Sequence, residues 1–198
     1  MSSLAEDSRA YDVIMSEVAA RFRRRSEGFS SRVAAVPQDR WSNPSPCKEW
    51  TARDVVGHMV ENMGFLLRLV GQEPPVGTSV DDDPVWAWST ACHAMQGALD
   101  DPETSQAEYD SEMMGGRGTL EQAVDRFGNL DVLVHTWDLA RATGLDERLD
   151  PDDVHQAFEA ALPMDDMLRG PRACGPKLDP PAGADEQTRF LAFLGRQA

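Results

Sequence analysis

The chain has 198 residues, of which 41% are hydrophobic and 27% are charged, and its formal net charge is −15. This length and composition predict one globular domain, spanning residues 1–198, with a single filled core. The acidic charge argues against nucleic acid as a partner, because binding to a phosphate backbone requires clustered cations.

Two further features bear on the compartment in which the protein acts. The sequence has no run of apolar residues long enough to cross a bilayer, so we expect no membrane partner. The N-terminus lacks the charged and then apolar pattern of a signal peptide. The three cysteines, Cys47, Cys92 and Cys174, are widely spaced and form no CxxC pair. These features together predict a cytoplasmic protein with reduced thiols rather than a disulfide framework.

Apolar residues recur at three- and four-residue steps in four long stretches, which predicts four long helices. The first extends from about residue 4 to 36 and is closed by Pro37. A short basic run at residues 21–25 lies inside this pattern. We interpret it as a solvated helix face rather than a binding patch.

The second predicted helix, about residues 51–70, follows a proline-rich linker. Thr51 and Asp54 are placed for a start that resembles a capping box. Apolar residues cover most of the circumference, which is typical of a helix in the middle of a bundle. His58 and Asn62 are the polar exceptions in its core-facing stripe.

The third predicted helix, about residues 84–99, begins with a proline that follows the N-cap candidate Asp83. Residues 100–118 show no convincing strand alternation, and we expect a polar loop there. The fourth helix, about residues 119–143, is followed by a strap and short helices over residues 151–196. The pattern predicts an all-α fold, a four-helix bundle with short extra helices at the C-terminus, either up-and-down or with a crossover.

Three polar residues lie in the middle of the apolar face of the fourth helix: Asp131, His135 and Asp138. Burial of such groups without partners is costly, so each must have a partner in the fold. Asp131 and His135 are four residues apart and project side by side, which suits two ligands of one divalent metal. Asp138 is expected to orient the His135 ring or to pair with Arg141.

A histidine on the second helix can supply the third ligand. Polar side chains on facing helices of a bundle commonly build metal sites. His58, Asp131 and His135 would form an open site for zinc, nickel or ferrous iron, with room for water and substrate. In the alternative, Asp131 and His135 form an ion pair, and His58 is hydrogen-bonded to Asn62 or to a backbone carbonyl. Spacing alone leaves both interpretations open.

Three segments resemble a known superfamily. Residues 41–58, WSNPSPCKEWTARDVVGH, resemble the start of the second helix in the DinB/YfiT-like superfamily. Residues 131–144, DVLVHTWDLARATG, resemble the fourth-helix motif of its mycothiol-dependent maleylpyruvate isomerase branch, and residues 174–196 are similar to the same relatives. The resemblance implies a four-helix bundle with a divalent metal, often zinc, bound by the two histidines and the aspartate named above.

The resemblance also implies a reaction class. The isomerase branch has Glu where this chain has Asp131, and it carries a second, C-terminal domain that we do not expect in 198 residues. Both departures argue against maleylpyruvate itself as the substrate. We therefore predict a metal-dependent enzyme that uses a mycothiol-type thiol for S-transfer to, or isomerisation of, a small electrophilic substrate. A metal-bound thiolate would be the nucleophile.

Two alternatives remain open at this point. A non-catalytic bundle that binds a metal or a small molecule is compatible with the lack of a separate base, nucleophile or phosphate loop. Metal-assisted hydrolysis would need a base, and only Glu61 or Asp138 is placed for that role. Glu61 and Asn62 are also candidates to line the cofactor cleft. A homodimer is compatible with a small bundle, although no exposed apolar seam requires it.

Overall fold

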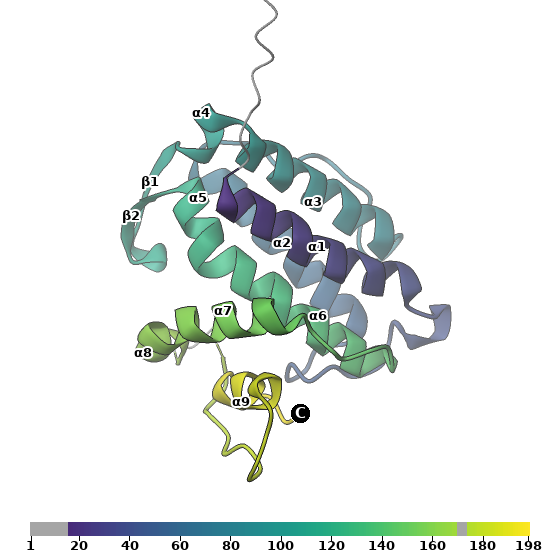
Figure 1. The fold of residues 1–198 in the computed structure, drawn as a ribbon. Helices are drawn as coiled ribbons and strands as arrows, with labels where there is room; N and C mark the ends of the chain where they lie inside the picture. The colour runs from purple at the N-terminus through teal and green to yellow at the C-terminus, as the bar shows by residue number, and fades with distance from the viewer. Residues whose placement is uncertain (1–15, 170–173) are drawn as a thin grey trace, which may run out of the picture.

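The computed structural model describes residues 16–169 and 174–198. Its four long helices, shown in Figure 1, are α1 (Glu17–Ala35), α2 (Ala52–Leu69), α3 (Pro84–Asp100) and α6 (Asn129–Thr143). Both α1 and α2 pack against α3 and α6, which places α1 and α2 at diagonal corners. The mostly helical bundle predicted from the sequence is confirmed, and it is the crossover variant.

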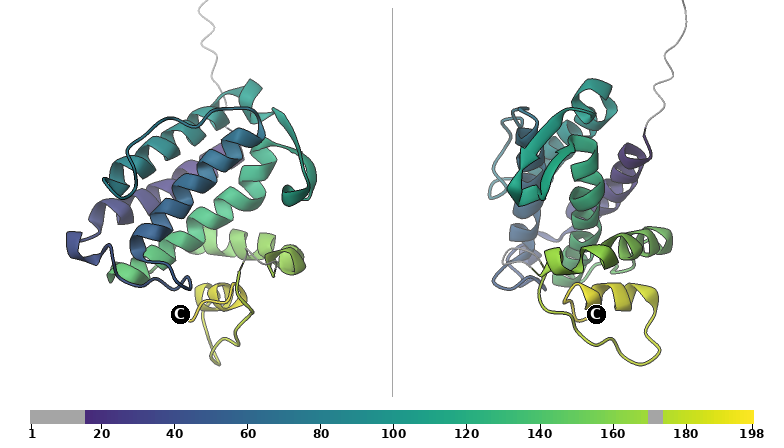
Figure 2. Two further views of the ribbon diagram at one scale, coloured as in Figure 1. Left: turned by 180° about the vertical axis from the view of Figure 1, so that it is seen from behind. Right: turned by 90° about the vertical axis from the view of Figure 1, so that its left-hand side faces the viewer.

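Shorter elements extend the bundle. They are α4 (Pro102–Ser105), β1 (Glu108–Ser111), β2 (Gly116–Thr119), α5 (Leu120–Ala123), α7 (Pro151–Ala161), α8 (Asp165–Leu168) and α9 (Glu186–Phe193), with single 3-10 turns at Gln38–Arg40, Glu112–Met114 and Leu162–Met164. In Figures 1 and 2, α7 crosses one end of the bundle and α9 lies beyond it. No helix in the described part of the chain combines the length and apolarity that a bilayer crossing requires.

Side-chain caps fix the helix starts. Ser16 caps α1, Thr51 caps α2 in a reciprocal capping box with Asp54, and Asp83 caps α3. Each cap satisfies backbone N–H groups that the first helical turn leaves without partners. The predicted starts of the second and third helices are thus confirmed. The first helix begins at Glu17, and the predicted portion before Ser16 lies outside the described residues.

Helix α6 is enclosed on nearly all sides. One side joins α1, α2 and α3 in the main apolar core. The other side, which includes Leu133 and Trp137, packs against α7 and α9 through Val154 and Phe190. The sequence favoured α2 as the central helix, but the C-terminal helices cover α6 and make it the more enclosed of the two.

An antiparallel hairpin occupies part of the stretch 100–118, for which a loop was predicted. Strands β1 and β2 pair in register, with Tyr109 opposite Gly118. A Cβ atom at Gly118 would lie 2.8 Å from the Tyr109 hydroxyl, so any larger residue would force the ring to move. The prediction of no strand was wrong, because four-residue strands with one buried apolar side chain show no alternation.

The predicted fourth helix contains a π-helical turn, Val124–Gly128, between α5 and α6. A π turn holds one extra residue and often lies at a functional site. Gly128 faces α2 here, because a Cβ atom on it would lie 3.3 Å from Leu66. The turn ends three residues before Asp131 and therefore sets the face that α6 presents to α2.

The arginines of the basic run at residues 21–25 are paired with acidic side chains from other elements. Arg23 contacts Asp100 at 2.8 Å, and both Arg24 and Arg25 donate to the Asp153 carboxylate. The interpretation of this basic run as a fully solvated face is wrong for Arg25, which is 5% exposed. In the described structure each arginine of the run has an acidic partner, so the run offers no cluster of free cations.

Candidate metal centre

The predicted ligand residues meet between α2 and α6. His58 lies on the second turn of α2, and Asp131 and His135 lie on consecutive turns of α6. One nitrogen from each imidazole and one carboxylate oxygen lie within 4.8 Å of one another. The fold thus brings together three residues that are up to 77 positions apart.

The spacing of these atoms fits two ligands of one tetrahedral ion. Nε2 of His58 is 3.3 Å from Oδ2 of Asp131. Two ligand atoms bonded to zinc at about 2.0–2.1 Å and at tetrahedral angles are about 3.3–3.4 Å apart. A direct hydrogen bond between charged groups is usually shorter, about 2.7–2.9 Å. The residues present therefore fit a divalent cation with nitrogen and oxygen ligands.

The burial of the three side chains differs. Those of His58 and Asp131 are 31% and 34% exposed, whereas that of His135 is 7% exposed. Solvent and a small ligand can therefore reach the set from one side. Burial would raise the pKa of Asp131, but the hydrogen bond from His58 and the charge of His135 lower it below its usual value.

Asp138 orients the His135 ring. Its Oδ2 is 2.9 Å from Nδ1 of His135, and its side chain is fully buried. A carboxylate that accepts the Nδ1–H proton leaves the Nε2 lone pair free for a metal. Arg141, the other predicted partner of Asp138, pairs with Glu147 instead.

Arg196 is a partner of Asp138 that sequence reasoning missed. It follows α9 and donates to the two carboxylate oxygens from Nε at 3.3 Å and from Nη2 at 2.9 Å. Burial alone would raise the pKa of Asp138, but the hydrogen bond from His135 and the charge of Arg196 hold it well below its usual range. The carboxylate is therefore ionised at neutral pH and acts as a fixed acceptor. The one available signal was the similarity of the C-terminal tail to the same relatives.

Cys47, also missed, lies behind His135. Its Sγ donates to Oδ2 of Asp138 at 3.3 Å and lies 4.0 Å from Nδ1 of His135, so these three residues form a second group of possible ligands. Burial, with the charge of Asp138, raises the pKa of the Cys47 thiol to about 12. The Arg196 guanidinium, 3.7 Å from the sulfur, already supplies a positive charge there. The geometry therefore favours the first group for a cation.

One tight turn supplies both Cys47 and an aromatic wall. The N–H of Trp50 donates to the carbonyl oxygen of Cys47 at 3.0 Å, and Glu49 between them has a φ of +67°. This conformation is typical of a type II turn, which favours glycine at that position. The centroid of the Trp50 ring lies 4.9 Å from that of His58 and 5.9 Å from that of His135. The indole therefore covers one side of the ligand set.

Asn62 and Glu61, the two candidates to line the cofactor cleft, differ in their contacts. Asn62 donates from Nδ2 to Oδ2 of Asp131 at 2.6 Å, so it touches a proposed metal ligand directly. In the described part of the chain, Asn62 and His58 are each hydrogen-bonded to Asp131 and not to each other, whereas the ion-pair alternative had His58 hydrogen-bonded to Asn62 or to a backbone carbonyl. Glu61 is exposed on the neighbouring face of α2.

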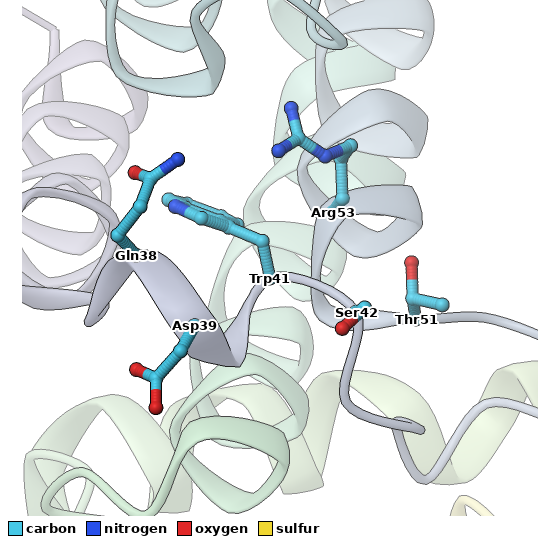
Figure 3. A pocket seen from close by; sticks show the side chains of 6 residues that line it. All are labelled: Gln38, Asp39, Trp41, Ser42, Thr51 and Arg53. Carbon is cyan, nitrogen blue, oxygen red and sulfur yellow. The ribbon is translucent and has the colours of Figure 1, made fainter.

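Two hollows lie away from the ligand set. The larger, about 370 Å³, is bordered by the turn before α2 and by the first turn of α2. Figure 3 shows Gln38 and Arg53 flanking the indole of Trp41, with Asp39 pointing away from it. The smaller, about 170 Å³, lies between α2 and α3 under the loop that joins them. Neither hollow is lined by a residue of the ligand set.

The fold and the converging side chains together define a helical bundle with a candidate metal site. The chain belongs to the family described as the mycothiol maleylpyruvate isomerase N-terminal domain, which it matches over residues 22–140. This match includes the whole ligand set with Cys47 and Asp138, and it ends before Arg196. The family is a mycothiol-related, metal-binding one, in agreement with the resemblance described above.

Two relatives from Mycobacterium tuberculosis are similar over most of their length. Uncharacterized protein MT0763 of strain CDC 1551 / Oshkosh and uncharacterized protein Rv0738 of strain ATCC 25618 / H37Rv are each 30% identical over 183 residues. The alignment covers 87% of this chain and 94% of each relative. No solved structure matches the chain.

Proposed function

We propose that the protein binds one divalent cation, zinc in preference to nickel or ferrous iron, through His58, Asp131 and His135. It uses this ion to activate a low-molecular-weight thiol of the mycothiol type for S-transfer to, or isomerisation of, a small electrophile. The observation that supports the proposal is the convergence of two imidazoles and one carboxylate within 4.8 Å, at a place that solvent reaches.

The donor set suits this chemistry. A bound divalent cation supplies the charge that keeps a coordinated thiol deprotonated at neutral pH. Two neutral imidazoles and one carboxylate cancel only one of its two positive charges. Three protein ligands also leave at least one position for an exogenous sulfur or water. A set with two or three acidic or thiolate ligands would lack this residual positive charge.

The surrounding residues prepare the set for its ligand. Asp138 keeps the proton of His135 on Nδ1, so that Nε2 faces the cation. Trp50 excludes water from one side and leaves the exposed edge of His58 and Asp131 as the approach. A thiol that enters there meets an apolar wall, which limits competition from water.

Metal-assisted hydrolysis is less well supported. It needs a free base near the ion, but Asp138 is fully buried and already accepts from His135, Arg196 and Cys47. These contacts commit its lone pairs to orienting neighbours. Of the two candidate bases, Asp138 and Glu61, this leaves only Glu61.

Elemental analysis of protein purified without chelator tests the proposal. We expect stoichiometric metal in the wild type and its loss in His58→Ala and His135→Ala, because each variant leaves only two ligands. His93→Ala is the matched control, since His93 is on α3 and its Nδ1 contacts the Ser89 carbonyl oxygen. Metal-free wild type, or full metal in His58→Ala, would contradict the site.

Activity is tested separately on the metal-loaded protein. When incubated with mycothiol and a panel of small electrophiles, the wild-type protein should consume free thiol faster than the His58→Ala variant does. Stoichiometric metal without any turnover would support the non-catalytic bundle instead.

A further inference from the structure

Asn62 and His58 approach Asp131 from the same face of α2. They are four residues apart, so their side chains lie one above the other on the helix. Nδ2 of Asn62 is 2.6 Å from Oδ2 of Asp131, and Nε2 of His58 is 3.3 Å from the same oxygen. Two groups from one helix thus converge on one carboxylate oxygen of α6.

This contact adds to that of His58 in restricting how the Asp131 carboxylate can turn. The Asp131 side chain is 34% exposed, and exposed carboxylates rotate about their last bond at little cost. A carboxylate oxygen has two lone pairs. The amide N–H of Asn62 occupies one lone pair of Oδ2, which leaves the other for a partner on the side of His58.

We propose that Asn62 is a positioning residue that holds Asp131 as a one-oxygen ligand of the cation and so keeps the site four-coordinate. The inference rests on the metal site proposed above. Without the amide, the carboxylate can turn to offer both oxygens, or it can swing toward solvent. The first movement raises the coordination number and the second removes a ligand, and in both the carboxylate loses the orientation that the amide fixes.

Asn62→Leu tests this role, because leucine has a similar volume and no donor. Cobalt(II) is the probe, since its visible absorption is strong in four-coordinate sites and weak at higher coordination. We expect Asn62→Leu to lower zinc and cobalt affinity by about 10–100-fold, as is common for groups that orient metal ligands, and to reduce the cobalt absorption. Asn62→Gln, which keeps an amide donor, should recover part of both.

Arg68→Gln is the matched control, because Arg68 is exposed on the last turn of α2 and belongs to neither group of possible metal ligands. It should leave affinity and spectrum unchanged. Circular dichroism and urea unfolding in chelator establish that each variant is folded. A purely structural tether between α2 and α6 would lower the unfolding midpoint but leave the spectrum of bound cobalt intact.

The outcomes separate the two proposals. Wild-type affinity and an unaltered cobalt spectrum in Asn62→Leu would overturn the positioning role while leaving the metal site standing. A wild type that takes up no cobalt or zinc would overturn the metal site and the positioning role together.

Discussion

The buried pair of Asp138 and Arg196 predicts a large and non-additive effect on stability. The Asp138 side chain is fully buried, that of Arg196 is 11% exposed, and the two are 2.9 Å apart. Asp138→Asn keeps the shape of the side chain but leaves the guanidinium without a counter-charge where water scarcely reaches. Removing one partner of a buried ion pair costs about 3–5 kcal/mol of unfolding free energy.

The reverse substitution is expected to cost less. Arg196→Met leaves Asp138 with the hydrogen bonds from His135 and Cys47. Of the two hydrogen bonds lost, the one from Nε is long at 3.3 Å, so the loss approximates one good hydrogen bond to a charged group, about 1.5–3 kcal/mol. In the double variant neither charge is stranded, so its cost should fall below the sum of the two single costs by about 1.5–3 kcal/mol.

Urea unfolding at neutral pH measures these costs. A chelator keeps all variants metal-free, and an unchanged dependence on urea concentration shows that the unfolded states are comparable. Arg148→Met is the control, because its pair with Asp146 is exposed and should contribute less than about 1 kcal/mol. Additivity of the Asp138 and Arg196 substitutions within about 0.5 kcal/mol would refute the reasoning.

Two further predictions concern the carboxylate beneath α1 and the glycine that turns the C-terminal tail. Burial would raise the pKa of Asp153, but the hydrogen bonds and charges of Arg24 and Arg25 lower it. The ionised Asp153 therefore stabilises the folded state above about pH 4, and this stabilisation is lost as the pH falls through the lowered pKa of the folded state. Asp153→Asn should therefore flatten the acid limb of a stability profile measured by urea unfolding, and an unchanged limb would contradict this. Gly195 and Gly144 have φ of +78° and +72°, but a Cβ atom would lie 2.8 Å from a backbone oxygen at Gly195 and meet nothing within 4 Å at Gly144. Alanine should cost about 1–2 kcal/mol at Gly144 and more at Gly195, so equal shifts in thermal unfolding would count against the described packing.

The features that the sequence predicted well depend on regular helical spacing. His58, Asp131 and His135, which stay predicted ligands, each lie in a helix with a clear apolar period, and the family resemblance linked the two helices. The start of α6 itself, at Gly128, has no side-chain cap. Asp138 was expected either to orient the His135 ring or to pair with Arg141, and the structure shows the first, because position three after a histidine lies on the same face. Long-range adjacency between the helices came from the resemblance rather than from spacing.

The features that sequence reasoning missed depend on contacts between distant segments or on irregular backbone. Arg196 meets Asp138 only because α9 packs under α6, and Cys47 reaches it only through a turn in which Glu49 adopts a left-handed conformation. The π turn was not predicted, because a helical wheel assumes a constant rotation per residue. The hairpin was not predicted because its strands show no apolar alternation: Tyr109 packs on Gly118.

The pairing of the arginines on α1 has a consequence for how ligands reach the protein. Their charges are offset locally by Asp100 and Asp153, while the chain as a whole carries a net charge of −15. The remaining negative field attracts divalent cations and repels anionic small molecules, over a range of about 8 Å at physiological salt. Cation capture should therefore be fastest at low ionic strength. A thiol without net negative charge meets less repulsion on approach than an anionic peptide thiol of similar size.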